Sequence, residues 1–312
     1  MDTATVARFE ASRNRLASLA YRLLGSAADA EDTVQDAFLR WQAADREYVE
    51  VPEAWLTKIV TNLALDRLRS AKMRRERAVG AWMPEPLLDG DPMLGPADTV
   101  EQRESVTLAV LTLMERLSPV ERAVYVLREA FAYSHAEIAE ILGITESASQ
   151  QHAHRARRRI AATGNGTDID RASARRIVEA FVDAASSGRT DRLVALLTDD
   201  ATGISDGAGG LAEKLILYST PERIANALRA GFKPSPAKRR FAGGSPSIHA
   251  AVVNGCPAML FTLDERVVGV AVLEVRDDKI AGVRSIAAPH RLGRLTEEWQ
   301  RQEHDVPLIE SW

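Results

Sequence analysis

The first 160 residues are dominated by apolar positions at helical spacing. The pattern predicts helix throughout residues 6–41, broken at Gly25-Ser26, and a further helix from Pro52, because proline is tolerated in a first turn. Helices resume after Val100. Ser118 is predicted to start one of them, since proline follows it at once and glutamate stands three residues later. This part of the chain is therefore predicted to be all-α.

Two short predicted helices joined at Gly143 occupy residues 133–159. Glycine permits the positive φ of a sharp turn, and either Thr145 or Ser147 can cap the second helix. That helix ends in four arginines among five residues. The pattern predicts a helix-turn-helix, whose second helix enters the major groove of DNA.

Residue spacing assigns the faces of this second helix. Four residues share one face and are predicted to point inward: Ser149, Ala153, Ala156 and Ile160. Ser149 stands where packing would favour an apolar side chain. His152 and His154 are two residues apart, so they lie on different faces and a shared metal ion is not expected.

Residues 80–99 differ in composition from both flanks. They contain four prolines, three glycines and three aspartates, which indicates an extended linker. Trp82 and Leu87-Leu88 are unusually apolar for a solvated tether, so part of the linker is predicted to dock on a domain.

After a second boundary at residues 163–169, helices are predicted to precede a meandering antiparallel sheet. The helices span residues 172–185, 191–197 and 220–230, and the strands span 247–253, 258–263, 267–275 and 280–286. Asn254-Gly255 marks a tight hairpin turn. The order favours a cone-shaped α+β domain with a pocket between helix and sheet. Its polar candidates are Asp206, Tyr218, His249 and His290.

Composition narrows the class of protein. Hydrophobic residues make up 46% and charged residues 27%, which is ordinary for a soluble globular chain. The lone Cys256 excludes an internal disulfide framework and a multi-cysteine metal site. The chain has no signal-like start and no apolar run of about 18 residues, so a cytosolic protein without a membrane partner is expected.

The net charge of −4 does not suggest a nucleic-acid binder, but the charges are segregated. Asp29, Asp32 and Asp36 share one helix face, which is either a solvated acidic face or a surface that docks a basic partner. Residues 55–79 hold seven Lys/Arg against two acids, with Asn and Thr interleaved. The side of this helix opposite its apolar residues is predicted to carry Lys58, Thr61, Asn62, Leu65 and Arg69. That combination favours phosphate contact together with base readout.

This order of acidic helix, basic helix, linker and helix-turn-helix resembles bacterial sigma factors of the sigma-70 family, group IV (extracytoplasmic-function type). The family core D-A-E-D-x-x-Q-D-x-F is met at residues 29–38. The pattern W-L-x-x-I-x-x-N-x-x-x-D-x-x-R is met at residues 55–69, and residues 117–129 open what resembles region 4. The resemblance covers residues 6–160.

The remainder is similar to SnoaL-like domains, which share the fold of nuclear transport factor 2. One subgroup of these sigma factors carries such a domain at its C-terminus. The subgroup's W-L-P-E-P linker is matched at residues 82–86, and its N-G-x-P-A hairpin at residues 254–258. Its D-G-G-G-K loop is met only in part from Asp206, because the lysine comes late as Lys214, and its N-P-D-K-L motif is not kept at residues 288–292.

The resemblance implies binding to core RNA polymerase and promoter DNA, with no cofactor, no metal and no catalytic residue. Region 4 would meet the β flap of the polymerase. Docking on the β′ clamp helices is assigned to Asp29, Asp32, Gln35, Asp36 and Phe38. The residues assigned to the −10 element are Lys58, Thr61, Asn62, Asp66, Arg67, Arg69, Arg74 and Arg75. Those assigned to the −35 element are Ser147, Gln150, Gln151, His154, Arg155 and Arg158.

The C-terminal domain is expected to contact the sigma domains within the chain and to regulate them in cis. The linker and loop residues assigned to this role are Trp82, Pro84, Glu85, Pro86, Asp206, Gly207, Asn254 and Gly255. A small ligand of unidentified class for this domain stays open. Two other classes of protein also stay open: a one-component helix-turn-helix regulator with a ligand-binding domain, and a SnoaL-like isomerase or cyclase fused to a DNA-binding module.

The expected organisation has three domains and a tail. Region 2 takes residues 1–79, the first linker 80–99, region 4 residues 100–162 and the second linker 163–169; the SnoaL-like domain takes 170–295 and the tail 296–312.

Replacing Asp32 and Asp36 together with alanine should weaken binding to core RNA polymerase, because carboxylates accept the paired hydrogen bonds of arginine. Two surface charge pairs correspond to a loss of several-fold to about thirty-fold in affinity. Equilibrium binding at moderate salt measures the loss, and circular dichroism checks that the variant is folded. Unchanged affinity in a folded variant would count against the docking assignment.

Overall fold

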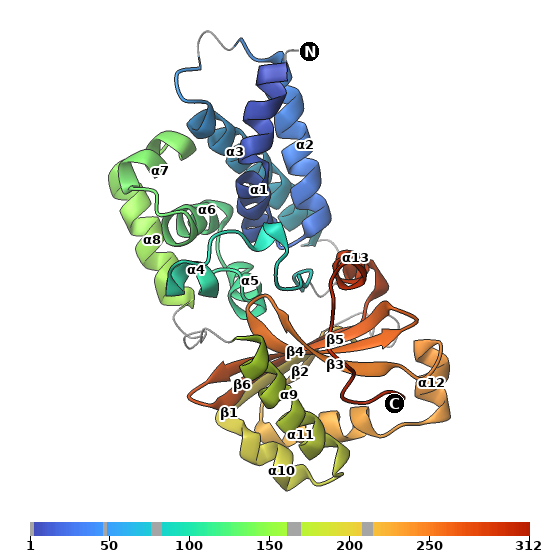
Figure 1. Ribbon diagram of the computed structural model, residues 1–312. Helices are drawn as coiled ribbons and strands as arrows, with labels where there is room; N and C mark the ends of the chain where they lie inside the picture. Colours follow the sequence, from blue (N-terminus) through green and yellow to red (C-terminus); the bar gives the residue numbers. More distant parts are fainter. Residues whose placement is uncertain (1–2, 46–48, 76–82, 161–169, 208–214) are drawn as a thin grey trace. The chain divides into compact units, whose positions relative to one another are not determined.

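The structure, a computed structural model, describes residues 3–45, 49–75, 83–160, 170–207 and 215–312. These residues form two compact units (Figure 1). One unit contains most of the helices that precede residue 160, and the other contains the residues after 170 together with the linker segment 83–89. Within the described ranges, no helix is both long enough and apolar enough to cross a lipid bilayer.

Three long helices open the first unit, as the apolar pattern predicts. They are α1 (Thr3–Leu24), α2 (Ala27–Ala43) and α3 (Pro52–Arg75). The rings of Phe9 and Phe38 lie 4.9 Å apart, and those of Trp41 and Trp55 lie 5.6 Å apart. The buried indole of Trp41 donates a hydrogen bond to the Thr5 carbonyl at 3.1 Å, so its polar atom is satisfied inside the bundle.

Shorter helical elements complete the unit. They are η2 (Pro92–Leu94), α4 (Val100–Glu104), α5 (Leu108–Met114), α6 (Pro119–Tyr125), the π-helical turn η3 (Val126–Ala130), α7 (His135–Leu142) and α8 (Glu146–Ile160). The predicted start at Ser118 is confirmed, because its side chain and that of Glu121 form a reciprocal capping box.

The helix-turn-helix formed by α7 and α8 is confirmed. Gly143 adopts a left-handed conformation with φ of 66°, which ends α7. Thr145, rather than Ser147, caps α8, because its hydroxyl accepts a hydrogen bond from the Ala148 amide at 3.1 Å. The predicted inward face is buried, and Ser149 lies there with its hydroxyl 2.9 Å from Nδ1 of His135. This polar pair explains why an apolar residue is not required at Ser149.

Arg22 on α1 is completely buried and joins three segments of the first unit. Its Nε donates to the Ser105 hydroxyl at 3.0 Å, and one terminal nitrogen donates to the carbonyls of Pro96 and Gln102, both at 3.2 Å. The other terminal nitrogen bonds the Ser18 hydroxyl and the Leu94 carbonyl. Burial lowers the pKa of Arg22 to about 10, so the side chain stays charged near neutral pH.

The second half of the first linker lies directly on α1. Gly95 has a φ of 68°, and a Cβ atom built there would lie 2.0 Å from the Ser18 hydroxyl. Glycine is therefore required at this position on two grounds, its backbone conformation and the close approach of α1. Asp91 starts the η2 turn by accepting a hydrogen bond from the Met93 amide at 2.8 Å.

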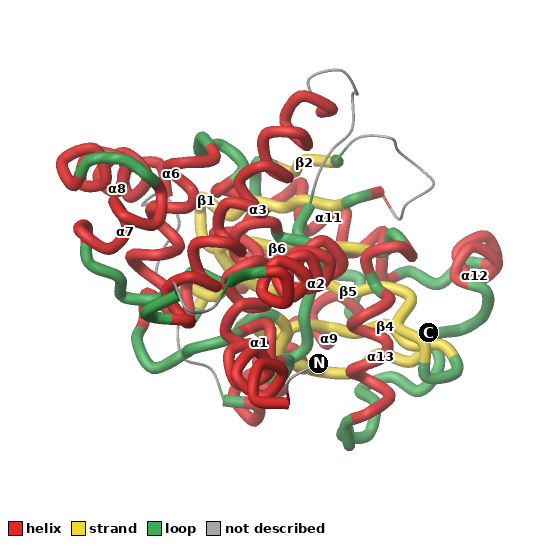
Figure 2. Tube along the Cα trace, turned by 90° about the horizontal axis from the view of Figure 1, so that it is seen from above, coloured by secondary structure: helices red, strands yellow, loops and turns green. Residues whose placement is uncertain are grey.

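A six-stranded sheet forms the centre of the second unit, in the order β2-β1-β6-β5-β4-β3. Figure 2 shows β1, β6, β5 and β4 side by side in this order. The strands are β1 (Leu197–Ser205), β2 (Ile216–Tyr218), β3 (Ser247–Val253), β4 (Cys256–Leu263), β5 (Arg266–Arg276) and β6 (Lys279–Ile286). Strands β3 to β6 form the predicted antiparallel meander, whereas β1 pairs with β6 in parallel.

Helices cover one face of this sheet (Figure 1). They are α9 (Arg171–Ser186), α10 (Thr190–Leu196) and α11 (Pro221–Phe232), and the unit also contains α12 (Pro236–Ala242) and α13 (Gly293–Arg301). Val178, Phe181 and Leu193 pack against Met259 and Leu273 in the core between the layers. The domain therefore has the α+β architecture expected from the order of its elements.

Four helices and strands of this unit are absent from the pattern-based prediction: β1, β2, α12 and α13. Of these, α13 extends into the segment assigned to the tail. The first strand carries Thr198, Asp199 and Asp200 at consecutive positions, and its burial does not alternate along its length. β2 has only three residues. Neither segment shows the period-two pattern that identifies a strand. In β1 the core residues Leu197 and Ala201 are four positions apart, and the register with β6 shifts between Leu197 and Thr202.

The thiol of Cys256 should react slowly in the folded protein. Burial raises its pKa to about 12, so at pH 8 the reactive thiolate is roughly a thousand-fold rarer than for an exposed cysteine. The rate of labelling by Ellman's reagent measures this, with the protein in 6 M guanidinium chloride as the fast reference. Labelling at the same rate in both states would contradict the enclosed position of Cys256.

Candidate functional site

The acidic face of α2 is organised around one arginine of α3. Arg67 lies 2.9 Å from Asp36, 3.6 Å from Asp29 and 3.7 Å from Asp32, taking the closest nitrogen and oxygen of each pair. The three carboxylates remain about half exposed or more, and Gln35 beside them is exposed. The single guanidinium of Arg67 does not neutralise all three carboxylates, so this face of α2 keeps a net negative charge.

The expected position of Thr61 on the exposed side of α3 is wrong. Thr61 is completely buried, and its hydroxyl donates to the Thr57 carbonyl at 2.7 Å. The prediction placed Leu65 on the same exposed side, and it is buried too. The physical reason is that α3 packs against α1 and α2 on one side and against α6 and α7 on another, so its apolar and polar faces are not simply opposite.

The other residues of the −10 set lie along α3. Lys58, Asp66 and Arg69 are exposed, and Asn62 is half-buried. Asp66 and Arg69 form an ion pair at 3.1 Å. Arg74 and Arg75 belong to the last turn of α3, and their side chains lie outside the described part of the structure.

Region 2 and the helix-turn-helix meet at Tyr133. Its hydroxyl lies 3.2 Å from the Thr57 hydroxyl and accepts a hydrogen bond from the guanidinium of Arg15. Arg15 also donates to Thr57 at 3.1 Å and lies over the ring of Phe131. Sequence reasoning did not identify this junction, because a tyrosine before a helix cap gives no signal of a distant partner.

The residues of α8 assigned from the sequence to the −35 element are all exposed: Ser147, Gln150, Gln151, His154, Arg155 and Arg158. Arg155 and Arg159 both bind the buried carboxylate of Glu121, at 3.0 and 2.7 Å. Burial acts to raise the pKa of Glu121, but hydrogen bonds from Ser118 and Arg155 and the charge of Arg159 outweigh it and hold that pKa below its usual value. These arginines therefore attach α8 to α6.

The two histidines of α8 are in different environments, as their spacing predicts. His152 is half-buried, and burial together with the neighbouring Arg155 lowers its pKa. His154 is exposed. The described ranges contain no group of three or more His, Cys, Asp or Glu side chains placed to hold a metal ion.

The first half of the linker adds to the sheet of the second unit at the edge of β3. Leu88 forms an antiparallel bridge with Val253, and the Asp89 amide donates to the Val252 carbonyl at 2.9 Å. Asn254 binds Leu87 twice: its side-chain oxygen accepts from the Leu87 amide at 2.8 Å, and its own amide donates to the Leu87 carbonyl at 2.9 Å. The predicted docking of Leu87-Leu88 is thus confirmed, and both leucines are buried.

The remaining linker and loop residues lie near this contact. Pro84 and Pro86 are buried and Glu85 is half-buried, while Trp82 lies outside the described residues. The guanidinium of Arg291 donates to the Met83 carbonyl. Burial lowers the pKa of Arg291, and the charges of Asp206 and Glu85 oppose that shift. Gly207 and Gly255 both have positive φ, which glycine adopts without strain.

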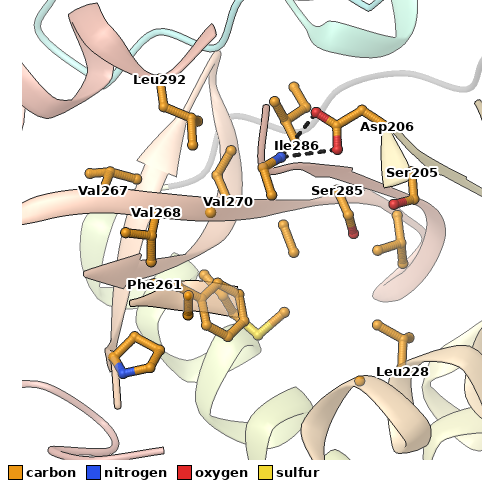
Figure 3. Close-up of a pocket in the computed structure, with 18 of the residues that line it drawn as sticks. Ser205, Asp206, Leu228, Phe261, Val267, Val268, Val270, Ser285, Ile286 and Leu292 are labelled. Carbon is orange, nitrogen blue, oxygen red and sulfur yellow. Dashed lines mark hydrogen bonds between the residues drawn. The ribbon is translucent and has the colours of Figure 1, made fainter. Parts of the chain in front are cut away.

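Asp206 follows β1 and binds the backbone after β6. Its carboxylate accepts a hydrogen bond from the Ala287 amide at 3.0 Å (Figure 3) and another from the Ala288 amide at 2.9 Å. These hydrogen bonds tie the end of β1 to the backbone after β6, so Asp206 serves as a structural anchor.

A cavity of about 720 Å³ lies between α11 and the sheet of the second unit. Asp206 and Tyr218 line it, as expected of two of the four polar candidates. His249 lies on β3, with its ring 4.9 Å from that of Trp299, and neither His249 nor His290 lines the cavity. The four candidates are therefore not brought together, and the arrangement provides no acid–base pair among them.

Comparison with known proteins assigns both helical regions. The family description "Sigma-70 region 2" matches residues 8–74, and "Sigma-70, region 4" matches residues 107–160. The ECF RNA polymerase sigma factor SigJ of Mycobacterium tuberculosis is 42% identical over 205 residues, which make up 65% of this chain and 65% of that protein.

Two further comparisons extend over nearly the whole chain. A Mycobacterium tuberculosis protein described as "Probable ECF RNA polymerase sigma factor SigI" is 32% identical over 297 residues, covering 94% of this chain and 96% of its own length. The crystal structure of Mycobacterium tuberculosis SigJ has a TM-score of 0.68 and 31% identity, covering 92% of this chain and 97% of that one. The helical regions, the α+β domain and these full-length similarities together show that the chain belongs to the extracytoplasmic-function (ECF) RNA polymerase sigma factors.

Proposed function

We propose that this chain binds core RNA polymerase and directs initiation at specific promoters, and that its C-terminal domain regulates this activity in cis through the linker. The observation that carries the first part is the combination of two exposed surfaces in one chain. One is the acidic face of α2, and the other is the polar face of α8 that includes Gln150 and Gln151. A repressor would need the second surface but not the first.

In this proposal each surface has its own partner. The carboxylates of α2 dock on the β′ clamp helices, where arginine forks match carboxylates well. The exposed side of α3, with Lys58 and Arg69, faces the −10 element, and α8 enters the major groove at the −35 element. The region 4 helices also meet the β flap. No catalytic role is proposed for any residue, because the polymerase performs the chemistry.

Region 2 and the helix-turn-helix must separate before they can contact the −10 and −35 elements of one promoter together. The −10 and −35 elements are about 25 base pairs apart, or roughly 85 Å of B-DNA at about 3.4 Å per pair. In this structure Thr57 of region 2 lies 3.2 Å from Tyr133 at the start of the helix-turn-helix. Regions in direct contact do not span such a distance, so the junction at Tyr133 has to separate.

The linker controls that separation. It is part of the chain segment between the end of α3 at Arg75 and the start of α4 at Val100. The 24 residues of this segment reach roughly 80 Å when fully extended. Two anchors shorten this reach: residues 87–89 pair with the edge of β3, and Arg22 binds the carbonyls of Leu94 and Pro96. The C-terminal domain, by holding the first anchor, favours the closed arrangement.

Reconstituted with core RNA polymerase, the full chain should form a holoenzyme that starts transcription at a defined set of promoters. Run-off transcription on a promoter library measures this, with core polymerase alone as the reference. A one-component regulator would not co-purify with core polymerase and would not direct initiation, so that result would reject the proposed function.

Asn254→Gly in the full chain should raise promoter-specific run-off transcription by about two- to ten-fold, the range for one hydrogen bond to a buried amide. Glycine keeps the positive φ of position 254, where Asn254 has a φ of 50°, but removes the oxygen that binds Leu87. The matched control is Asp277→Gly, at another turn residue with a φ of 50° and an exposed side chain.

Removal of residues 165–312 should change transcription in the same direction as Asn254→Gly. Equal output from wild type, Asn254→Gly and the Asp277→Gly control, with all three folded, would reject control through the linker.

A further inference from the structure

The cavity of the second unit has the size and lining of a small-molecule site. Its volume of about 720 Å³ lies within the range of ligand pockets, roughly 300–1,000 Å³. Most of the lining is apolar, and Leu228 of α11 faces Phe261, Val268 and Val270 across the space (Figure 3). A mainly apolar concavity of this size, with a few polar groups in its lining, is the usual form of a small-molecule site.

Three hydroxyl groups of the lining lie on the adjacent strands β2, β1 and β6. Ser205 on β1 and Ser285 on β6 are register partners, so their side chains leave the sheet on the same face, next to each other (Figure 3). Tyr218 lies on the neighbouring strand β2. Three hydroxyl groups on adjacent strands beside an apolar space match a ligand with one polar end and an apolar body.

Each charged side chain in the described lining is either hydrogen-bonded to the backbone or exposed. Asp206 binds the amides of Ala287 and Ala288. Lys238 donates to carbonyls in the last turn of α11, including that of Gly231 at 3.0 Å. Arg266 lines the cavity but is exposed. Among the described lining residues no inward charge is left to balance an ion, so the occupant should be neutral.

Trp312 forms one wall of this space. Its indole nitrogen donates to the Phe232 carbonyl at 2.9 Å, and its amide donates to the Pro246 carbonyl at 2.9 Å. Its ring packs edge-to-face against Phe261, with centroids 6.5 Å apart. The wall is therefore built from specific contacts and is part of the domain.

The cavity and the linker share one segment of chain. Ala287, Pro289 and Leu292 line the cavity, and Arg291 between them donates to the Met83 carbonyl of the linker. Asp206, which also lines the cavity, fixes the start of this segment. A molecule bound in the cavity would therefore contact residues 287–292, the same segment that binds the linker through Arg291.

We propose that the cavity binds a neutral, mainly apolar small molecule with a hydroxyl or carbonyl group at the end near Ser205 and Ser285. Its binding changes the hold of residues 287–292 on the linker. The binding step stands independently, whereas its effect on transcription rests on the proposed function in cis.

The test uses the full chain and the neutral fluorescent probe N-phenyl-1-naphthylamine. Wild type should bind it saturably at one site. Leu228→Trp and Val268→Trp, which fill the cavity from the helix and from the sheet, should each weaken binding at least ten-fold. The matched control is Val306→Trp, at a position 75% exposed in the tail and outside the lining, and its affinity should equal that of wild type.

Hydrogen–deuterium exchange of residues 83–89 measures the coupling without polymerase. Adding the probe should change exchange at the Leu87 and Asp89 amides, which bond to Asn254 and Val252, in wild type and not in Leu228→Trp. Thermal unfolding checks each variant, and if one filled variant does not fold, the other decides.

These measurements test the binding site, its coupling to the linker and the proposed function separately. Absent saturable binding in wild type, or equal binding in wild type and every folded variant, overturns the site. Cavity-dependent binding with unchanged exchange at residues 83–89 overturns the coupling. Binding and coupling in a chain that forms no holoenzyme would reject the proposed function while leaving this site in place.

Discussion

The guanidinium of Arg22 is enclosed in the first unit, where five acceptors from α1, the linker and the residues around α4 bind it. Removing the side chain would leave several of these buried acceptors unpaired, and lysine could not reach them with the same planar geometry. Region 2, the linker and the start of region 4 are joined through this one cation. Arg22 therefore holds the linker and the residues around α4 against α1, while the hydroxyl of Tyr133 connects the helix-turn-helix to α3.

Elements with a strong period were predictable from the sequence. The helices before residue 160 and the strands of the meander were found because each has one buried face or a clear turn at its end. The linker contact was indicated by its two leucines, although the edge of β3 as its partner was not.

The features that the sequence did not predict all depend on tertiary packing. Arg22 gave no signal, because a single arginine on an apolar helix is usually exposed. Thr61 was misplaced because α3 is covered on more than one side. The junction at Tyr133 and the contact of Arg291 with Met83 join residues far apart in sequence. In the candidate site, residue spacing along the sequence predicted which side chains of α8 are exposed. It did not predict the ion pairs that Arg155 and Arg159 form with Glu121.

Many of the chain's charges are engaged with each other. Arg67 sits among the acids of α2, and Arg155 and Arg159 hold Glu121. These contacts reduce the number of cations available for phosphates, the main source of non-specific affinity for DNA. The neutral amides of Gln150 and Gln151 remain exposed on α8. A surface of this kind favours base-edge contacts over general attraction to the DNA backbone.

The pairing of Leu88 with Val253 has a consequence for solubility. A sheet edge with free amides and carbonyls is a template for pairing with another chain, and β3 is an edge strand of this sheet. The linker covers one end of that edge, and Ile309 covers the other through its bridge with Ile248. If the linker left β3, as the proposed regulation in cis requires, the amides and carbonyls at one end of this strand would be exposed. Copies of the chain in that state could then pair through β3.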